Sequence, residues 1–314
     1  MAAADLLVEL GASIAVLIGD ASHARFGVAV SGGPDSMALL DLALRAFPDR
    51  VEAATVDHGL REGSAAEAAM VADWCRERSV PHVTLHPDDP VRGNLQQWAR
   101  RQRYHLLEAW RAERRIDWLL TAHHADDQLE TLLMRLNRGA GVNGLAGVRA
   151  RQGHVLRPLL GMRKPALIAY AADRSLPYAD DPSNHDPRFD RAVLRRALAD
   201  AEWIVVEAAG RSAAALGEAE EALDWTVDMF ETRHVRAEGA AWLLDRTDFP
   251  RELLRRLLLR LFKRADPQGI PPRGEALDRA IAAAQRGEKV SVGHCLLKGG
   301  AEWTVLLAPR RRWQ

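Results

Sequence analysis

The sequence contains very few cysteines. There are two in 314 residues, Cys75 and Cys295, and they form no CxxC pair. A zinc site built on paired cysteines, an iron–sulfur cluster and a disulfide framework are therefore not expected. This cysteine usage is typical of a protein in a reducing cytoplasm.

Long hydrophobic runs and an excess of one charge are also missing. The apolar stretch Gly11–Gly19 is too short to span a bilayer, and the acidic Asp5 and Glu9 precede it where a signal peptide carries positive charge. We therefore expect a cytoplasmic protein with no membrane partner. Lys+Arg and Asp+Glu both total 43, so the net charge does not indicate a polyanionic partner.

Short apolar runs alternate with helix-like stretches through the first half of the chain. The predicted strands are Phe26–Val30, Val51–Val56, His82–Leu85 and Trp118–Ala122. The predicted helices that follow them are Asp35–Arg45, Ala65–Glu77, Asn94–Arg115 and Asp127–Asn137. This alternation predicts an α/β fold with a mostly parallel sheet covered by helices on both faces.

The composition changes after about Gly210. Amphipathic helices are predicted at Ser212–Arg233, Arg251–Arg264 and Glu275–Arg286, and Lys289–Leu307 resembles a pair of short strands. We therefore expect two domains, residues 1–210 and a smaller, mainly helical domain over residues 211–314. The glycine-rich segment Arg138–Gly147 is predicted to be loop or tight turn.

Polar segments follow three of the predicted strands. They are Ser31–Ser36 (SGGPDS), Asp57–Gly59 (DHG) and His123–Asp127 (HHADD). Ligands of open parallel sheets bind beyond the carboxyl ends of the strands. The sequence therefore predicts one site to which all three segments contribute.

The SGGPDS loop has the features of a phosphate-binding turn. Gly32 and Gly33 allow a sharp turn and a close approach of backbone N–H groups to a ligand. Pro34 suits the first turn of the next helix, whose N-terminus attracts anions, and the two serines supply hydroxyl donors. The lysine of the Walker motif is missing, so nothing in the loop extends toward a γ-phosphate. The alternative is an ordinary strand–turn–helix junction.

Asp35 is the unusual member of this loop, because a carboxylate repels a bound phosphate unless a cation lies between them. A Mg²⁺ ion would remove the conflict. Asp127 and Glu130 share one face of a predicted helix, and this acidic segment could supply a second carboxylate facing Asp35 across the ion. The alternative is that these acids only complement helix N-termini. Asp57 and His58 are either ordinary strand-end residues or part of a nucleoside pocket.

Together these segments resemble the N-type ATP pyrophosphatase (PP-loop) superfamily, and within it the tRNA(Ile)-lysidine synthase family. The matching segments are VAVSGGPDS (Val28–Ser36), VDHGLR (Val56–Arg61), HHADDQLETLLMRLNRGAGVNGLAGV (His123–Val148), RPLL (Arg157–Leu160) and DPSNHDPRFDRAVLR (Asp181–Arg195). The similarity covers roughly residues 25–200. It implies an adenine nucleotide alpha hydrolase-like catalytic domain followed by a tRNA-binding one.

The resemblance implies a two-step ligation that uses ATP, Mg²⁺ and free L-lysine. ATP adenylates the C2 oxygen of the wobble cytidine (tRNA position 34) of the minor tRNA(Ile) with a CAU anticodon, and pyrophosphate leaves. The ε-amine of lysine then attacks C2 and expels AMP. The product reads AUA codons.

The resemblance also implies roles for particular residues. The ATP-binding residues would be Ser31, Gly32, Gly33, Pro34, Asp35, Ser36, Asp57 and His58. The Mg²⁺ ligands would be Asp35 and Asp127. The catalytic residues would be Asp35, His123, Asp127, Arg191 and Arg195. Which of Arg188, Arg191 and Arg195 contacts the phosphate is left open.

Basic residues are concentrated in the predicted helix Asn94–Arg115 and just before it. They are Arg92, Arg100, Arg101, Arg103, Arg111, Arg114 and Arg115. Such a cluster is either a solvated helix face or a surface for tRNA phosphates. The terminal run Arg310–Arg312 is either a disordered tail or a second phosphate-binding surface.

Two other classes of function are compatible with parts of this pattern. Another PP-loop tRNA-modifying enzyme is one, although thiolases usually need paired cysteines and glutamine-dependent amidases need a further domain. A non-catalytic nucleotide- or RNA-binding relative is the other, and it would be expected to lack Asp35, Asp126 and Asp127. Homodimerisation is left open.

Overall fold

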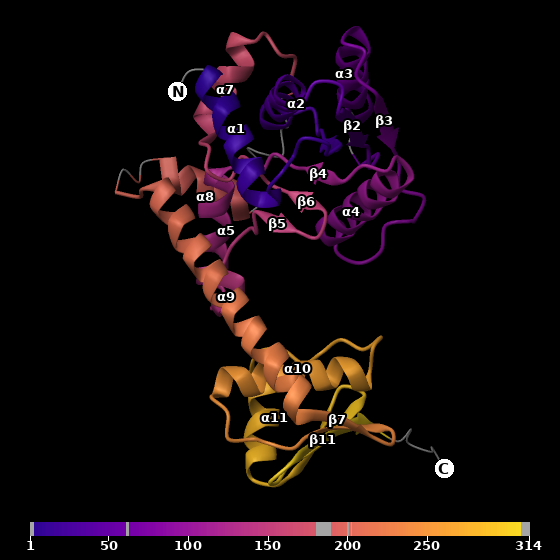
Figure 1. Ribbon diagram of the computed structural model, residues 1–314, viewed down its shortest axis with the longest axis vertical. Helices are drawn as coiled ribbons and strands as arrows, with labels where there is room; N and C mark the ends of the chain where they lie inside the picture. Colours follow the sequence, from indigo (N-terminus) through magenta and orange to yellow (C-terminus); the bar gives the residue numbers. More distant parts are fainter. Residues whose placement is uncertain (1–2, 61–62, 180–189, 200, 202, 309–314) are drawn as a thin grey trace. The chain divides into compact units, whose positions relative to one another are not determined.

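The computed structural model describes residues 3–60, 63–179, 190–199, 201 and 203–308 (Figure 1). The chain divides into two compact units, Met1–Gly217 and Glu218–Gln314. The division falls within helix α9 (Val206–His234), as does the boundary at Gly210 that the sequence predicted. Helix α9 starts before that glycine, so Gly210 lies inside a helix.

The first unit contains a six-stranded sheet in the order β3-β2-β1-β4-β6-β5. Its strands are β1 (Phe26–Ala29), β2 (Val51–Val56), β3 (His82–Leu85), β4 (Trp118–Leu120), β5 (Arg151–Gln152) and β6 (Val155–Leu156). All neighbouring pairs are parallel except β5 with β6. The parallel sheet and the four predicted strands are confirmed.

Helices cover both faces of this sheet, as predicted. Those of the first unit are α1 (Ala3–Ile18), α2 (Pro34–Ala46), α3 (Ser64–Glu77), α4 (Leu95–Glu113), α5 (Ala125–Asn137), α6 (Val142–Leu145), α7 (Lys164–Asp173), α8 (Asp190–Ala199) and the start of α9. Helix α1 contains most of the apolar N-terminal run, for which the sequence predicted no element. Helix α6 forms one short turn of helix within the glycine-rich segment that was predicted to be loop or tight turn.

Alternate side chains of the central strands pack into different layers. Phe26 and Val28 of β1 belong to the larger core with buried residues of α1, α2, α3 and α7. The opposite face packs on α4 through Leu107 and Trp110. A Cβ added to Gly27 would lie 2.7 Å from the Trp110 ring, so this glycine lets α4 approach β1 closely.

The second unit contains helices, as expected, together with a five-stranded antiparallel sheet in the order β7-β8-β11-β10-β9. Its elements after α9 are β7 (Val235–Glu238), β8 (Ala241–Leu244), α10 (Arg251–Ala265), α11 (Glu275–Gln285), β9 (Lys289–Val292), β10 (Cys295–Lys298) and β11 (Trp303–Leu307). The sequence indicated only a pair of these strands. No helix in the described part of the chain is long and apolar enough to cross a membrane.

Candidate active site

A cavity of about 1200 Å³ lies beyond the carboxyl ends of β1, β2 and β4. The three predicted polar segments all contribute to it, which confirms that the fold brings them together. Side chains from α3, from the first two-thirds of α4 and from α7 and α8 also line it. Its polar lining residues include Ser31, Asp35, Ser36, Asp57, His58, Arg103, Thr121, His123, His124, Asp127, Lys164, Arg191 and Arg195.

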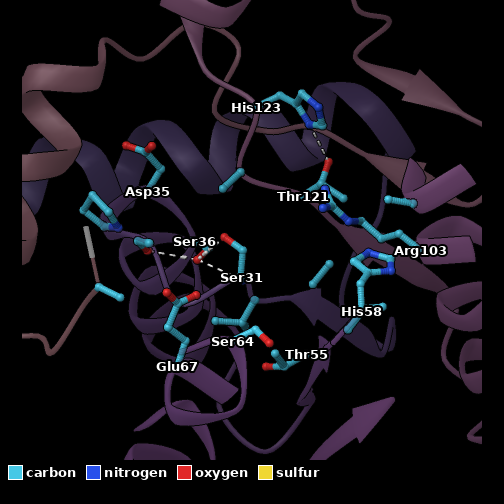
Figure 2. A pocket seen from close by; sticks show the side chains of 18 of the residues that line it. Ser31, Asp35, Ser36, Thr55, His58, Ser64, Glu67, Arg103, Thr121 and His123 are labelled. Atoms are coloured by element: carbon cyan, nitrogen blue, oxygen red, sulfur yellow. Dashed lines mark hydrogen bonds between the residues drawn. The ribbon is translucent and has the colours of Figure 1, made fainter. Parts of the chain in front are cut away.

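The SGGPDS loop forms a tight turn between β1 and α2. Gly32 adopts φ +84°, a conformation that side chains other than glycine rarely tolerate. The Ser36 hydroxyl donates to the Gly33 carbonyl at 2.9 Å and accepts from the Ser31 N–H at 3.1 Å (Figure 2). Gly33 at the N-cap of α2 has no side chain to cap the helix, so the first-turn N–H groups remain without a side-chain acceptor. This geometry suits a bound anion.

Asp35 has one oxygen committed to neighbours and one without a partner. Its Oδ2 lies 3.6 Å from His124 Nε2 and 3.8 Å from Lys164 Nζ. Its Oδ1 is buried and has no hydrogen-bond partner among the described residues. A buried carboxylate oxygen beside a cavity is a suitable ligand for Mg²⁺, which usually takes one or two protein carboxylates and completes its shell with phosphates and water. The donor set therefore fits this ion.

His124, which the sequence analysis did not single out, lies between the two predicted metal-binding acids. Its Nε2 is 3.5 Å from Asp127 Oδ2, and the two residues cap α5 reciprocally. In that cap, the Asp127 N–H donates to His124 Nδ1 and Asp127 accepts from the His124 N–H. Burial opposes protonation of His124, but the hydrogen bond to Asp35 and the charge of Asp127 outweigh it and raise its pKa. A histidine directly before an acidic first helical turn was the available signal.

His123 lines the cavity, as expected for a site residue. Its Nδ1 lies 3.0 Å from the Thr121 hydroxyl (Figure 2). Burial lowers the pKa of His123 to about 4, and the positive charge of Arg157 contributes in the same direction. The imidazole is therefore neutral near pH 7, so it can accept or relay a proton but supplies no positive charge.

Arg191 and Arg195 of α8 both reach the cavity, and both contact α5. Arg195 is held by buried Glu130 through Nε at 2.5 Å and Nη2 at 3.2 Å, and its Nη2 lies 3.7 Å from Asp127 Oδ1. Arg191 Nη2 donates to the Thr131 hydroxyl at 3.1 Å, and its Nε is 3.8 Å from Glu130. Arg195 is the more firmly positioned of the two.

Residues on the β2 side of the cavity have the character of a nucleoside pocket (Figure 2). Asp57 accepts from the Gly59 N–H at 2.9 Å. Burial favours protonation of Asp57, but this bond and one from Ser64 outweigh it and lower the pKa. Both ring nitrogens of His58 are buried without a hydrogen-bond partner in the described structure, and a base or ribose could satisfy them.

The predicted tRNA-binding arginines divide between the two ends of α4. Arg103 extends into the cavity (Figure 2). Arg100 lies over the Tyr104 ring in the same half of the helix. At the other end, Arg111 pairs with Glu108 at 2.6 Å and Arg114 pairs with Glu52 at 2.8 Å. Arg92, Arg101 and Arg115 are exposed. The segment Asp181–Asn184, Arg188 and Arg310–Arg312 lie outside the described residues.

Comparisons with known proteins give the same family assignment. The family model of the PP-loop domain matches residues 6–202. The tRNA(Ile)-lysidine synthase of Zymomonas mobilis is 40% identical, with 92% of this chain and 90% of that protein aligned. The tRNA(Ile)-lysidine synthase of Novosphingobium aromaticivorans is 41% identical, again with 92% of this chain and 90% of that protein aligned. That of Ruegeria pomeroyi is 43% identical, with 88% of this chain and 69% of that protein aligned.

A solved structure shares the fold. The U34-tRNA thiolase NcsA from Methanococcus maripaludis aligns with a TM-score of 0.54 at 16% identity, over 69% of this chain and 80% of that one. At this identity the likeness shows the PP-loop fold alone, and the specific assignment depends on the sequence relatives. With about nine-tenths of its length aligned to tRNA(Ile)-lysidine synthases at about 40% identity, the chain belongs to that family of PP-loop proteins.

Proposed function

We propose that this protein ligates free L-lysine to C2 of the wobble cytidine of the minor tRNA(Ile) with a CAU anticodon, at the expense of ATP. The observation that supports this most strongly is the convergence of the SGGPDS loop, Asp127 and Arg195 on one large cavity within a chain of this family. The cavity offers an uncapped helix N-terminus, an unpartnered carboxylate oxygen and a positioned guanidinium. Adenylation by ATP needs these features.

In the first step, the cytidine O2 attacks the α-phosphorus, and the bond to the β-phosphate oxygen breaks with its electron pair leaving on pyrophosphate. The N–H groups of Ser31–Ser36 would hold the phosphates, and Arg195 would face the charge that develops at the α-phosphate. Asp35, with Asp127, would hold Mg²⁺, which when bound neutralises phosphate charge. His58 and Asp57 would contact the nucleoside of ATP.

In the second step, the lysine ε-amine attacks C2, the C2–O bond breaks, and AMP leaves with the electron pair. The amine loses a proton in this step, and neutral His123 is the proposed acceptor. An imidazole with a pKa of about 4 is a weak base on its own. Bound phosphates would offset the arginine charges that contribute to this low value, and would therefore strengthen the base.

The tRNA would enter past the half of α4 that borders the cavity. Arg100 and Arg101 belong to this half and are exposed, so they are the proposed phosphate contacts. Arg111 and Arg114 already neutralise carboxylates of the chain. Because the proposed substrates are tRNA, ATP and lysine, we place the reaction in the cytoplasm. The sequence leaves homodimerisation open.

The test is transfer of radiolabelled lysine to an in vitro transcript of the minor tRNA(Ile), with ATP and Mg²⁺ present. We expect label in the tRNA with stoichiometric AMP and pyrophosphate. A matched transcript with uridine at the wobble position is the substrate control and should remain unlabelled. Asp35→Asn should abolish transfer while leaving the circular dichroism spectrum unchanged. Failure of the wild-type protein to label the cytidine transcript would refute the proposal.

A further inference from the structure

Lys164 is the only lysine in the first 262 residues of the sequence. It is the first residue of α7 and lines the cavity. Its Nζ lies 3.8 Å from Asp35 Oδ2, and its side chain is 30% exposed. An ammonium group therefore stands next to the phosphate loop, but it is contributed by an element more than a hundred residues further along the chain.

The backbone of Lys164 is fixed by the protein. Asp126 of α5 accepts from the Lys164 N–H at 2.7 Å and pairs with Arg163 at 3.2 Å. Further along, α7 is joined to α2 by the Tyr170 hydroxyl, which donates to buried Asp41 at 2.5 Å. Since α2 also carries Asp35, both ends of the Lys164–Asp35 contact are anchored on the same pair of helices.

We propose that Lys164 binds the β- and γ-phosphates of ATP and remains with pyrophosphate as it leaves. It would thereby supply the cation that the SGGPDS loop lacks within its own sequence. The inference rests on the proposed function in one respect, the binding of ATP at this loop. It adds a substrate-contacting residue that the motif did not indicate.

The chemistry of the leaving group favours this role. When the bond between the α-phosphorus and the bridging oxygen breaks, its electron pair adds negative charge to pyrophosphate. A lysine ammonium is a compact point charge on a flexible stem, so it can follow phosphate oxygens that move as the bond lengthens. In the described structure this ammonium faces the Asp35 carboxylate, and phosphate oxygens would become its partners when ATP enters.

The competing explanation is that Lys164 only balances the charge of Asp35. Chemical labelling of the wild-type protein separates the two. Reductive methylation modifies accessible lysine amines, and peptide mass spectrometry measures each site. We expect ATP or inorganic pyrophosphate, each with Mg²⁺, to slow methylation of Lys164 by about fivefold or more, since a bound polyanion immobilises the ammonium. AMP should not protect it, and exposed Lys289 of the second unit should react equally in every sample.

Variants give an independent measurement. Lys164→Met should weaken binding of a non-hydrolysable ATP analogue about tenfold or more and leave AMP binding within about twofold, since one charge-assisted contact to the outer phosphates is lost. Lys164→Arg should restore most of the affinity for the analogue. Lys289→Met is the matched control and should change the affinity for neither ligand. If the ion pair with Asp35 were purely structural, Lys164→Met would lower the melting temperature and change the affinities for the ATP analogue and AMP alike.

These outcomes are separable from the fate of the proposed function. If wild-type protein binds ATP but Lys164 is methylated equally fast with and without it, the proposed phosphate contact of Lys164 is wrong. The proposal that the protein transfers free lysine to tRNA would not be affected by that result. Equal loss of ATP-analogue and AMP affinity in Lys164→Met would also overturn it. Should the protein protect Lys164 as expected yet transfer no lysine, the phosphate contact stands and the proposed reaction fails.

Discussion

Arg195 and Glu130 form a two-pronged ion pair between α8 and α5, with Nε 2.5 Å from Oε1 and Nη2 3.2 Å from Oε2. Glu130 is buried, so its charge requires this partner. The pair fixes the guanidinium at the cavity wall beside Asp127. The sequence alone left open which arginine of the last motif contacts the phosphate, and this relationship favours Arg195 over Arg191.

Replacing the two arginines in turn tests that choice. We expect Arg195→Ala to slow tRNA-dependent release of pyrophosphate about 100-fold or more, because a preorganised charge at the reacting phosphate is lost. Arg191→Ala should cost less than about tenfold, since its contacts are to a hydroxyl and to a carboxylate at 3.8 Å. Single-turnover pyrophosphate assays measure both. Equal losses, or a larger loss for Arg191→Ala, would contradict the assignment.

His123 should make the protein less stable in mild acid. Its pKa falls from the ordinary value near 6.5 to about 4 in the folded state, mainly because it is buried. Between these values the unfolded chain takes up a proton that the folded chain does not, so stability is lost as the pH falls from 6.5 toward 4. The loss from this group is at most about 3 kcal/mol.

Urea unfolding at a series of pH values measures this contribution. His123→Gln should lose less stability than the wild type between pH 6.5 and 4.5, while exposed His105→Gln should follow the wild-type curve. Parallel curves for wild type and His123→Gln would show that the folded imidazole titrates normally.

The contact between α2 and α7 should depend on one hydroxyl. Tyr170 donates to Asp41 at 2.5 Å and accepts from Arg45 at 3.0 Å, while burial raises the pKa of Tyr170 to about 12, so the donor stays protonated. Tyr170→Phe should destabilise the protein by about 1–3 kcal/mol, because Asp41 loses its shortest partner. Thermal unfolding measures this, and exposed Tyr178→Phe serves as the control. A melting temperature equal to that of the control would contradict the prediction.

Two parts of α4 should contribute unequally to tRNA affinity. Arg100→Ala and Arg101→Ala together should weaken tRNA binding about tenfold in moderate salt, and should reduce the dependence of affinity on salt concentration. Arg114→Ala should leave affinity within about twofold, because Arg114 is paired with Glu52. Filter binding across a salt series separates the two. A loss for Arg114→Ala as large as that for the pair would place the RNA at the opposite end of the helix.

Much of the fold could be predicted because its signals are local. The strands Val51–Val56 and His82–Leu85 occur as expected, since each is a short apolar or β-branched run between turn residues. The polar segments at the strand ends converge because parallel topology brings carboxyl ends to one edge. Strand β7 escaped prediction because most of its residues are exposed and show no apolar alternation.

The parts of the site that could not be predicted depend on tertiary packing. Lys164 lies outside the segments that carry the family resemblance, and its ammonium group lies near Asp35 because α7 packs on α2. The pairing of Arg195 with Glu130 requires α8 to dock on α5, across 65 positions of sequence. The sequence does not distinguish His124 from His123, because only the cap of α5 directs one of the two adjacent histidines toward the acids.

We propose that this cavity transfers AMP to the wobble cytidine before lysine arrives. The most direct measurement uses ATP labelled at the α-phosphate, Mg²⁺ and the minor tRNA(Ile) transcript, first without lysine and then with it. We predict that label appears on the tRNA while pyrophosphate is released, and that added lysine discharges the label as AMP. Two results would contradict this order of steps. One is incorporation of lysine without any label on the tRNA, and the other is no reaction at all.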